Sequence, residues 1–326
     1  MGARARALAA SILVFAAFAA LAAWSSWAPS TKVRVALAPL VAHLTTYAYL
    51  NGYVQGPEGV ELEVSPTLQF NLYLMSGWAD VGEMSTAAFA IARERGIPLK
   101  IVSAAVVQGS YMGNALVFVK RGSDIASPSD LRGRTIAVHD LKATTTAIFL
   151  SLLEKDYGVG PEEVSLAIVP LPQMPEQLWQ GRVDAALAFE FVAASMYLDD
   201  SRYSLIWDVS EAFKRRYGSY PVASVIVARE ELLRERPWVV GEVLGVLRRS
   251  LAWSMSHLDE VASSWVKEGG GTLEQFAACL SQFKVELELS EDHVRTIATI
   301  FHLLEEAGVV GRAPTREEAF AELVWK

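Results

Sequence analysis

Two glutamates occupy positions that could place carboxylates in a binding site. Glu83 lies in the loop that follows the apolar run Ala79–Val81, and Glu190 directly follows Ala185–Phe189. Short apolar runs of this kind predict strands, and α/β sheets bind ligands at strand ends. Both side chains are therefore candidate ligand contacts. The alternative for each is a solvated loop charge or a surface salt bridge.

A pair of such carboxylates would select the charge of its ligand. A negative group 6 Å from one carboxylate meets about 2.8 kcal/mol of repulsion at an effective dielectric constant near 20. The N-terminus of a helix returns only ~0.3 to 2 kcal/mol. Unless Lys142 compensates, we expect a neutral, cationic or zwitterionic solute rather than a small inorganic anion.

Hydroxyl groups gather where two helices are expected to begin. Lys142, Thr144 and Thr145 follow the predicted strand Thr135–Val138, and Ser85 and Thr86 stand at the head of another helix. Free backbone N–H groups and hydroxyls at a helix start could bind an anion or a carbonyl group. The alternative is an ordinary helix cap, which every helix needs.

Further candidates lie in other predicted strand-end loops. Tyr111 and Tyr220 could stack on a flat ring, although aromatic residues at strand ends also fill cores. His43 and His139 could donate to ligand oxygens, although a lone histidine more often makes a structural hydrogen bond. The complete set of candidate ligand contacts is His43, Thr45, Glu83, Ser85, Thr86, Tyr111, Asn114, His139, Lys142, Thr144, Thr145, Glu190 and Tyr220. No spacing indicates a catalytic triad or a metal site, so we expect no catalytic residue, metal or cofactor.

The elements that must position these residues alternate along the chain. From Lys32 onward, β-branched runs alternate with helical stretches, which predicts an α/β fold with mostly parallel sheets flanked by helices. Residues 72–81 and 178–187 each read as a short helix, a glycine and a strand with an aspartate near its start. We interpret them as equivalent units of two lobes. Val222–Ala228 is the last clear strand, and the chain beyond Glu230 is predicted to be helical.

The composition of the 326 residues limits the possible partners. The chain has 37 acidic against 29 basic residues and a formal net charge of −8, which disfavours binding to nucleic acid. Charged residues make up 20%, which is too many for a protein with many membrane spans. The single cysteine, Cys279, excludes an intramolecular disulfide and is best interpreted as a small buried residue.

The N-terminal 30 residues have the pattern of an export signal. Arg4 and Arg6 precede the apolar stretch Ala7–Trp24, and polar residues follow it. Its length lies between a signal core and a minimal membrane span, so residues 1–30 are a cleaved signal peptide or a membrane anchor. Either way we expect residue 31 onward outside the cytoplasm.

Several blocks resemble a known family. They are Asn51–Tyr53 with Gly59–Leu62, WADVGEMSTA at 78–87, Gly96–Pro98, ALVFVKRGSDIASPSDLRGR at 115–134, and GRVDAA at 181–186. Their order resembles that of periplasmic solute-binding proteins of ABC transporters, in the nitrate, sulfonate, taurine and thiamine-precursor class. The resemblance spans about residues 32–230.

The resemblance implies a type II periplasmic-binding-protein fold that closes on its ligand. Lobe 1 would comprise residues 31–116 and 225–326, lobe 2 residues 117–224, and the strands Ala115–Lys120 and Val222–Ala228 would form a two-strand hinge. The solute would be a small nitrogen- or sulfur-containing nutrient, such as a heterocyclic thiamine precursor or a sulfonate or taurine-like compound. The implied partners are the permease and ATPase subunits of an ABC importer.

An enzyme on the same fold is the competing hypothesis. Such a protein would be a lyase or dehydratase with Glu83, His139 or Glu190 as acid or base. The thiamine-pyrimidine synthases that share the fold use a cysteine-rich motif, which this sequence lacks. Export also argues against the enzyme hypothesis, so we expect a binding protein.

Overall fold

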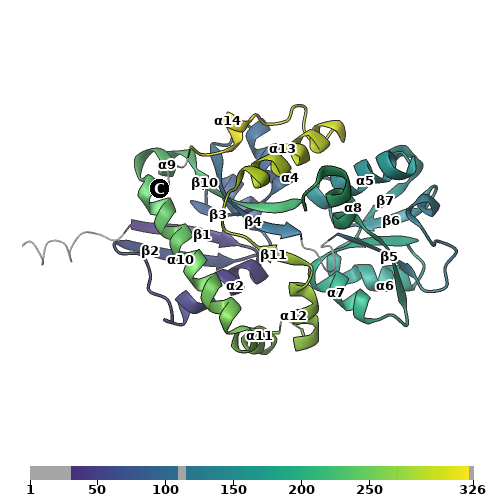
Figure 1. Ribbon diagram of the computed structural model, residues 1–326, viewed down its shortest axis with the longest axis horizontal. Coiled ribbons are helices and arrows are strands. Elements are labelled where there is room, and N and C mark those ends of the chain that lie inside the picture. Colours follow the sequence, from purple (N-terminus) through teal and green to yellow (C-terminus); the bar gives the residue numbers. More distant parts are fainter. Residues whose placement is uncertain (1–30, 109–114, 270, 323–326) are drawn as a thin grey trace, which may run out of the picture.

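The chain forms two α/β lobes that lie side by side (Figure 1). The computed structural model describes residues 31–108, 115–269 and 271–322. Each lobe is built on one mixed sheet, and helices cover both sheets. The predicted two-lobed α/β architecture is confirmed. The predicted export segment, residues 1–30, lies outside the described residues.

The first lobe contains a six-stranded sheet in the order β11-β4-β10-β3-β1-β2. Strands β1, β2 and β3 are mutually parallel, whereas β10 runs antiparallel between β3 and β4. The short strand β11 extends the sheet beyond β4. The bounds are β1 Thr31–Leu37, β2 Val60–Pro66, β3 Val81–Ser85, β4 Leu99–Gln108, β10 Val222–Arg229 and β11 Phe283–Val285.

The second lobe contains a five-stranded sheet in the order β7-β6-β8-β5-β9. Strand β6 is parallel to β7 and β8, and β5 runs antiparallel to β8 and β9. In each sheet one strand, β10 in the first and β5 in the second, therefore lies between two strands that run in the opposite direction. The bounds are β5 Leu116–Lys120, β6 Thr135–Val138, β7 Ser165–Ile168, β8 Ala185–Ala188 and β9 Tyr203–Asp208.

Helices cover both faces of each sheet because both faces carry apolar side chains. Their bounds are α2 Pro39–Leu50, α3 Phe70–Ser76, α4 Thr86–Glu94, α5 Thr144–Tyr157, α6 Met174–Trp179, α7 Glu190–Leu198, α8 Val209–Tyr217, α9 Glu230–Glu235, α10 Pro237–Ser256, α11 Leu258–Lys267, α12 Leu273–Leu280, α13 Glu291–Glu306 and α14 Arg316–Ala319. Among the described helices, none combines the length and apolarity needed to cross a membrane.

The core of the first lobe has two layers, one on each face of the sheet. Helices α2 and α10 cover one face, where Leu44 and Val243 are fully buried. Helices α4 and α13 cover the other face, where Phe89 and Phe301 stack with ring centroids 5.9 Å apart. Burial of one such side chain contributes roughly 1.5 to 3 kcal/mol. These layers hold the strand ends, and hence Glu83, in fixed positions.

The close pairing of β1 and β3 explains one glycine. Gly82 pairs with Ala36 in the parallel ladder, and a Cβ atom at Gly82 would collide with the Ala36 carbonyl oxygen. Only glycine allows the backbone to approach so closely there. The position of Glu83, the next residue, therefore depends on this glycine.

Two strands were absent from the sequence prediction. Strand β9 lies at the edge of the second sheet, and β11 interrupts a region that was predicted to be entirely helical. β11 has only three residues, and its pairing with Gln108–Val106 of β4 decides its conformation. A run this short carries no periodic signal in the sequence.

The chain crosses between the lobes at two places. The first crossing follows β4 and includes residues 109–114, which lie outside the description; the second is Gly218–Pro221. They lie next to each other, since the Gln108 amide N–H donates to the Pro221 carbonyl oxygen at 2.9 Å. The predicted hinge strands themselves belong to different sheets, β5 to the second lobe and β10 to the first. The return boundary predicted at residue 224 thus falls inside β10.

Candidate functional site

Glu83 is a buried carboxylate within the first lobe's sheet. It lies on β3, and only 3% of its surface is exposed. The Ala38 N–H donates to its Oε2 at 3.0 Å, and the Ser224 hydroxyl donates to its Oε1 at 2.6 Å. Burial raises the pKa of Glu83, and these two hydrogen bonds oppose the rise. Both donors are uncharged groups, so neither of them neutralises the charge of an ionised Glu83.

Glu190 begins helix α7 of the second lobe. Its φ of 51° is the left-handed conformation, which non-glycine residues adopt rarely and which concentrates at functional sites. Burial, and then the charge of Glu83, raise the pKa of Glu190 to about 7. Glu83 belongs to the first lobe and Glu190 to the second. Glu190 follows β8, as predicted, whereas Glu83 lies inside β3 and not in a loop after it, because the strand extends to Ser85 and pairs with β10.

A residue just after helix α12 of the first lobe contacts Glu190. The Gln282 Nε2 donates to the Glu190 carbonyl oxygen at 3.1 Å, and Gln282 is fully buried. The Oε1 of the same amide accepts no hydrogen bond from the described part of the chain. Cys279 is also buried, and burial followed by the charge of Glu190 raises the pKa of its thiol. Cys279 is therefore a neutral core residue, as the sequence predicted.

The starts of two helices meet across the lobes. The Ala87 N–H at the start of α4 donates to Thr144 Oγ1 at the start of α5, at 3.0 Å. Within lobe 1, Ser85 caps α4 by accepting from the Ala88 N–H. The Thr86 hydroxyl donates to the Val222 carbonyl oxygen at 2.7 Å. Thr144 thus joins the lobes, whereas Ser85 and Thr86 have the structural roles that were the alternative reading.

Other predicted residues surround this region in the second lobe. His139 packs edge-on against Phe189, with centroids 4.9 Å apart. Burial lowers the pKa of His139, and Asp140 opposes the change. Thr145 is buried, while Lys142 is exposed and its backbone N–H donates to Asp140. Lys142 therefore extends into solvent rather than pairing with a described carboxylate.

Three predicted residues have partners inside a single lobe or at the crossing. His43 contacts the Val261 carbonyl oxygen through Nε2 at 3.0 Å. The Thr45 hydroxyl donates to the Val41 carbonyl oxygen of its own helix. The Tyr220 hydroxyl donates to Glu211 at 2.7 Å. Each of these groups is already engaged in a structural contact. Tyr111 and Asn114 lie outside the described residues.

Sequence reasoning missed two side chains of the site. Ser224 sits in β10 and donates to Glu83, and Gln282 follows α12 and contacts Glu190. A polar residue in the otherwise apolar run 222–228 was a detectable signal for Ser224. Gln282 gave none, because its position beside Glu190 depends on the packing of α12 against α7.

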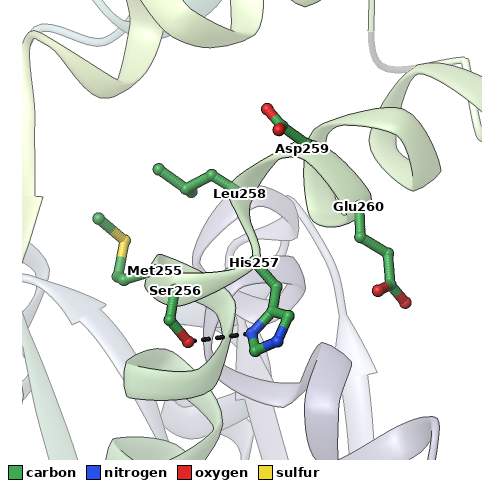
Figure 2. Close-up of a pocket in the computed structure, with 6 residues that line it drawn as sticks. All are labelled: Met255, Ser256, His257, Leu258, Asp259 and Glu260. Atoms are coloured by element: carbon green, nitrogen blue, oxygen red, sulfur yellow. Dashed lines mark hydrogen bonds between the residues drawn. The ribbon is translucent and has the colours of Figure 1, made fainter.

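Two surface hollows of the described residues are lined by residues other than the two glutamates. Figure 2 shows one of about 430 Å³ at the turn between α10 and α11, where the Ser256 hydroxyl contacts His257. A larger one, of about 1190 Å³, lies beside β4 and is lined by residues of α9, α10, α13 and α14. Neither contains a predicted site residue. Among the described residues, no group of three or more His, Cys, Asp or Glu side chains could hold a metal ion.

The fold and this interlobe arrangement define a two-lobed periplasmic-binding-protein architecture. A family model described as "NMT1/THI5 like" matches residues 47–261, more than half of the chain. The chain therefore belongs to the NMT1/THI5-like family, which confirms the resemblance found in the sequence. Among curated proteins, no sequence matches the chain significantly.

Solved structures share the fold. The periplasmic aliphatic sulphonate binding protein SsuA from Escherichia coli has a TM-score of 0.73 and 14% identity, covering 89% of this chain and 92% of its own. The ligand binding component of an ABC-type import system from Staphylococcus aureus, with zinc bound, has a TM-score of 0.68 and 14% identity. The match covers 89% of this chain and 96% of that protein. A DszB mutant in complex with biphenyl-2-sulfinic acid has a TM-score of 0.64 and 14% identity. The match covers 90% of this chain and 97% of that protein. At this identity the likenesses establish the fold and leave the ligand open.

Proposed function

We propose that this protein is the extracytoplasmic solute-binding component of an ABC importer. It captures a small organic nutrient between its lobes and delivers it to a permease that works with an ATPase subunit. The nutrient contains nitrogen or sulfur. Residues 1–30 serve as the export signal or as the membrane anchor.

One observation carries this proposal: polar groups of the first lobe interact with polar groups of the second. Glu83 and Ala87 belong to the first lobe, and Glu190 and Thr144 to the second. The Ala87–Thr144 hydrogen bond and the influence of Glu83 on Glu190 both cross between the lobes. A solute bound there would contact both lobes at once, so it would bind the closed form more tightly than the open form. Such differential affinity is what drives ligand-induced closure.

An enzyme on the same fold remains the second candidate, for a specific reason. Glu190, with its pKa raised to about 7, could exchange a proton at neutral pH, and burial also raises the pKa of Glu83. A pair of carboxyl groups with different environments is the usual arrangement for acid and base roles. The reaction class would be elimination of water or cleavage by proton transfer.

A screen against small solutes tests both candidates. The full chain is mixed with amines, pyrimidines, flavins and sulfonates, and thermal unfolding and X-ray scattering are measured. A solute that raises Tm and compacts the protein, and is recovered unchanged, supports transport. A solute consumed in proportion to time and protein supports the enzyme. If no solute in the screen raises Tm or compacts the protein, the proposed function is refuted.

A further inference from the structure

Helix α2 begins without a cap from its own sequence. Ala38 is its N-cap residue, since the Ala38 carbonyl oxygen accepts from the Ala42 N–H at 2.8 Å. An alanine side chain cannot accept a hydrogen bond, and the first turn, Pro39–Val41, contains no acidic residue. The Ala38 N–H and the positive end of the helix dipole therefore need an acceptor from another part of the chain.

Other helices of this protein solve the same problem within their own sequence. At the start of α12, the Thr272 hydroxyl accepts from the Gln275 N–H, and Gln275 Oε1 accepts from the Thr272 N–H at 2.9 Å. Ser290 and His293 form the same arrangement at the start of α13. In such a capping box, the third helical residue supplies the acceptor for the N-cap N–H. In α2 that position is Val41, which is apolar and buried.

Glu83 supplies the missing acceptor from a neighbouring strand. Its Oε2 accepts from the Ala38 N–H at 3.0 Å, which is the bond that the third helical residue makes in a capping box. Strands β1 and β3 are parallel and pair Ala36 with Gly82, so Glu83 lies next to the chain that leads into α2. A carboxylate at a helix N-terminus is attracted by the helix dipole, and an ionised acceptor makes a stronger hydrogen bond than a neutral one.

Ser224 holds this carboxylate in its orientation. The Ser224 hydroxyl donates to Glu83 Oε1 at 2.6 Å, so each oxygen of the carboxylate accepts a bond from within the first lobe. Glu83 is 3% exposed and Ser224 is 6% exposed, so water is largely kept from this bond. Ser224 lies on β10, shortly after the crossing Gly218–Pro221. The carboxylate thus joins the start of α2 to the beginning of the returning strand.

We propose that Glu83 is a positioning residue that caps helix α2 from strand β3, with Ser224 orienting its carboxylate. The tertiary structure supplies the acidic group that other helices carry in their own first turn. Helix α2 begins where β1 ends, which is the edge at which α/β sheets bind ligands. The cap therefore fixes one border of that edge. This role concerns the fold of the first lobe and holds whatever solute the protein binds.

Hydrogen exchange at the start of α2 tests the cap. Exchange is measured by mass spectrometry on the full chain, in a fragment covering residues 39–46 of α2 and in a reference fragment covering residues 294–304 of α13. Glu83→Leu removes both acceptor oxygens, whereas Glu83→Gln keeps one oxygen and removes the charge. Met84→Leu is the control for a buried change on the same strand, and Glu61→Gln, exposed on β2, is the surface control.

We expect Glu83→Leu to exchange about tenfold faster in the α2 fragment and to stay within about twofold of wild type in the α13 fragment. Glu83→Gln and Ser224→Ala should each accelerate the α2 fragment about threefold, because the Ala38 N–H keeps an acceptor. Met84→Leu should change both fragments by the same factor, and Glu61→Gln should change neither. An unchanged α2 fragment in Glu83→Leu, or equal acceleration of both fragments, overturns the proposed cap.

A second substitution tests the cap by rescue. Ala38→Asp gives α2 a carboxylate at its own N-cap position. In the wild type this carboxylate meets that of Glu83, so Tm should fall; in Glu83→Leu it replaces the lost cap, so Tm should rise and exchange in the α2 fragment should slow. The same comparison in Glu83→Gln serves if Glu83→Leu does not fold. An effect of Ala38→Asp with the same sign and size in both backgrounds overturns the proposal.

Discussion

Replacing Glu190 with glutamine should stabilise the protein at neutral and alkaline pH. Burial and the charge of Glu83 raise the pKa of Glu190 from 4.5 to about 7. The folded state therefore binds this proton more tightly than the unfolded chain does. Stability is highest below pH 4.5 and falls as the pH rises toward 7, because ionisation is easier in the unfolded chain. Above pH 7 the penalty is complete.

The size of the effect follows from the pKa change. Each pKa unit corresponds to 1.36 kcal/mol, so the full penalty is about 3 kcal/mol. Unfolding entropy scales with chain length, so this free energy corresponds to a Tm difference of about 5 °C. Glu190→Gln should recover most of it at pH 8 and nothing at pH 4, since the wild-type carboxyl is then neutral.

Thermal unfolding monitored by circular dichroism between pH 4 and pH 8.5 measures the Tm of the wild type and of Glu190→Gln. The Tm difference between Glu190→Gln and wild type should grow through the window from 4.5 to 7. The exposed control Glu61→Gln should shift Tm equally at every pH. A Glu190→Gln variant that is less stable than wild type at pH 8, or whose difference does not depend on pH, would show that the carboxylate is not held unfavourably.

Three further substitutions have expected outcomes. Gly82→Ala forces a Cβ onto the Ala36 carbonyl oxygen, so it should cost more than 3 kcal/mol in urea unfolding or leave no soluble protein. Thr144→Val removes the acceptor of the buried Ala87 N–H, so it should lower the free energy of unfolding in urea by about 1 to 3 kcal/mol, and an unchanged value would show that this bond does not hold the lobes together. Lys142→Ala should leave solute affinity within twofold, because its side chain is exposed; a larger loss would place Lys142 at the ligand.

The backbone conformation of Glu190 connects stability with function. A left-handed φ and a carboxylate near a like charge both cost free energy in the folded protein without solute. Sites that bind ligands are often less stable than the sequence would permit, since the stabilising substitutions remove the binding groups.

Much of this fold could be predicted from local patterns. Strands such as Val60–Pro66 and helices such as Thr86–Glu94 follow from apolar runs, glycine stops and capping residues that act over a few positions. The order of the family blocks could also be recognised in the sequence, and it predicted the two-lobed architecture. The short strand Phe283–Val285 could not be predicted, because its conformation depends on pairing with β4.

The site was predicted in its parts and not in its arrangement. The sequence indicated that Glu83 and Glu190 follow strand ends, which depends only on local periodicity. It did not indicate that Ser224 donates to one and Gln282 contacts the other. It left open whether Thr144 was a helix cap or a ligand contact, and it did not indicate the contact with Ala87 of the other lobe.

The sequence by itself determined the alternating elements, the family, and the types of polar group at the strand ends, since each arises from neighbouring residues. Only the tertiary structure raised the pKa values of the two glutamates and engaged His43 and Tyr220 elsewhere. Burial and charge proximity are properties of residues far apart in the chain. They exist only after both sheets have formed and the lobes have met.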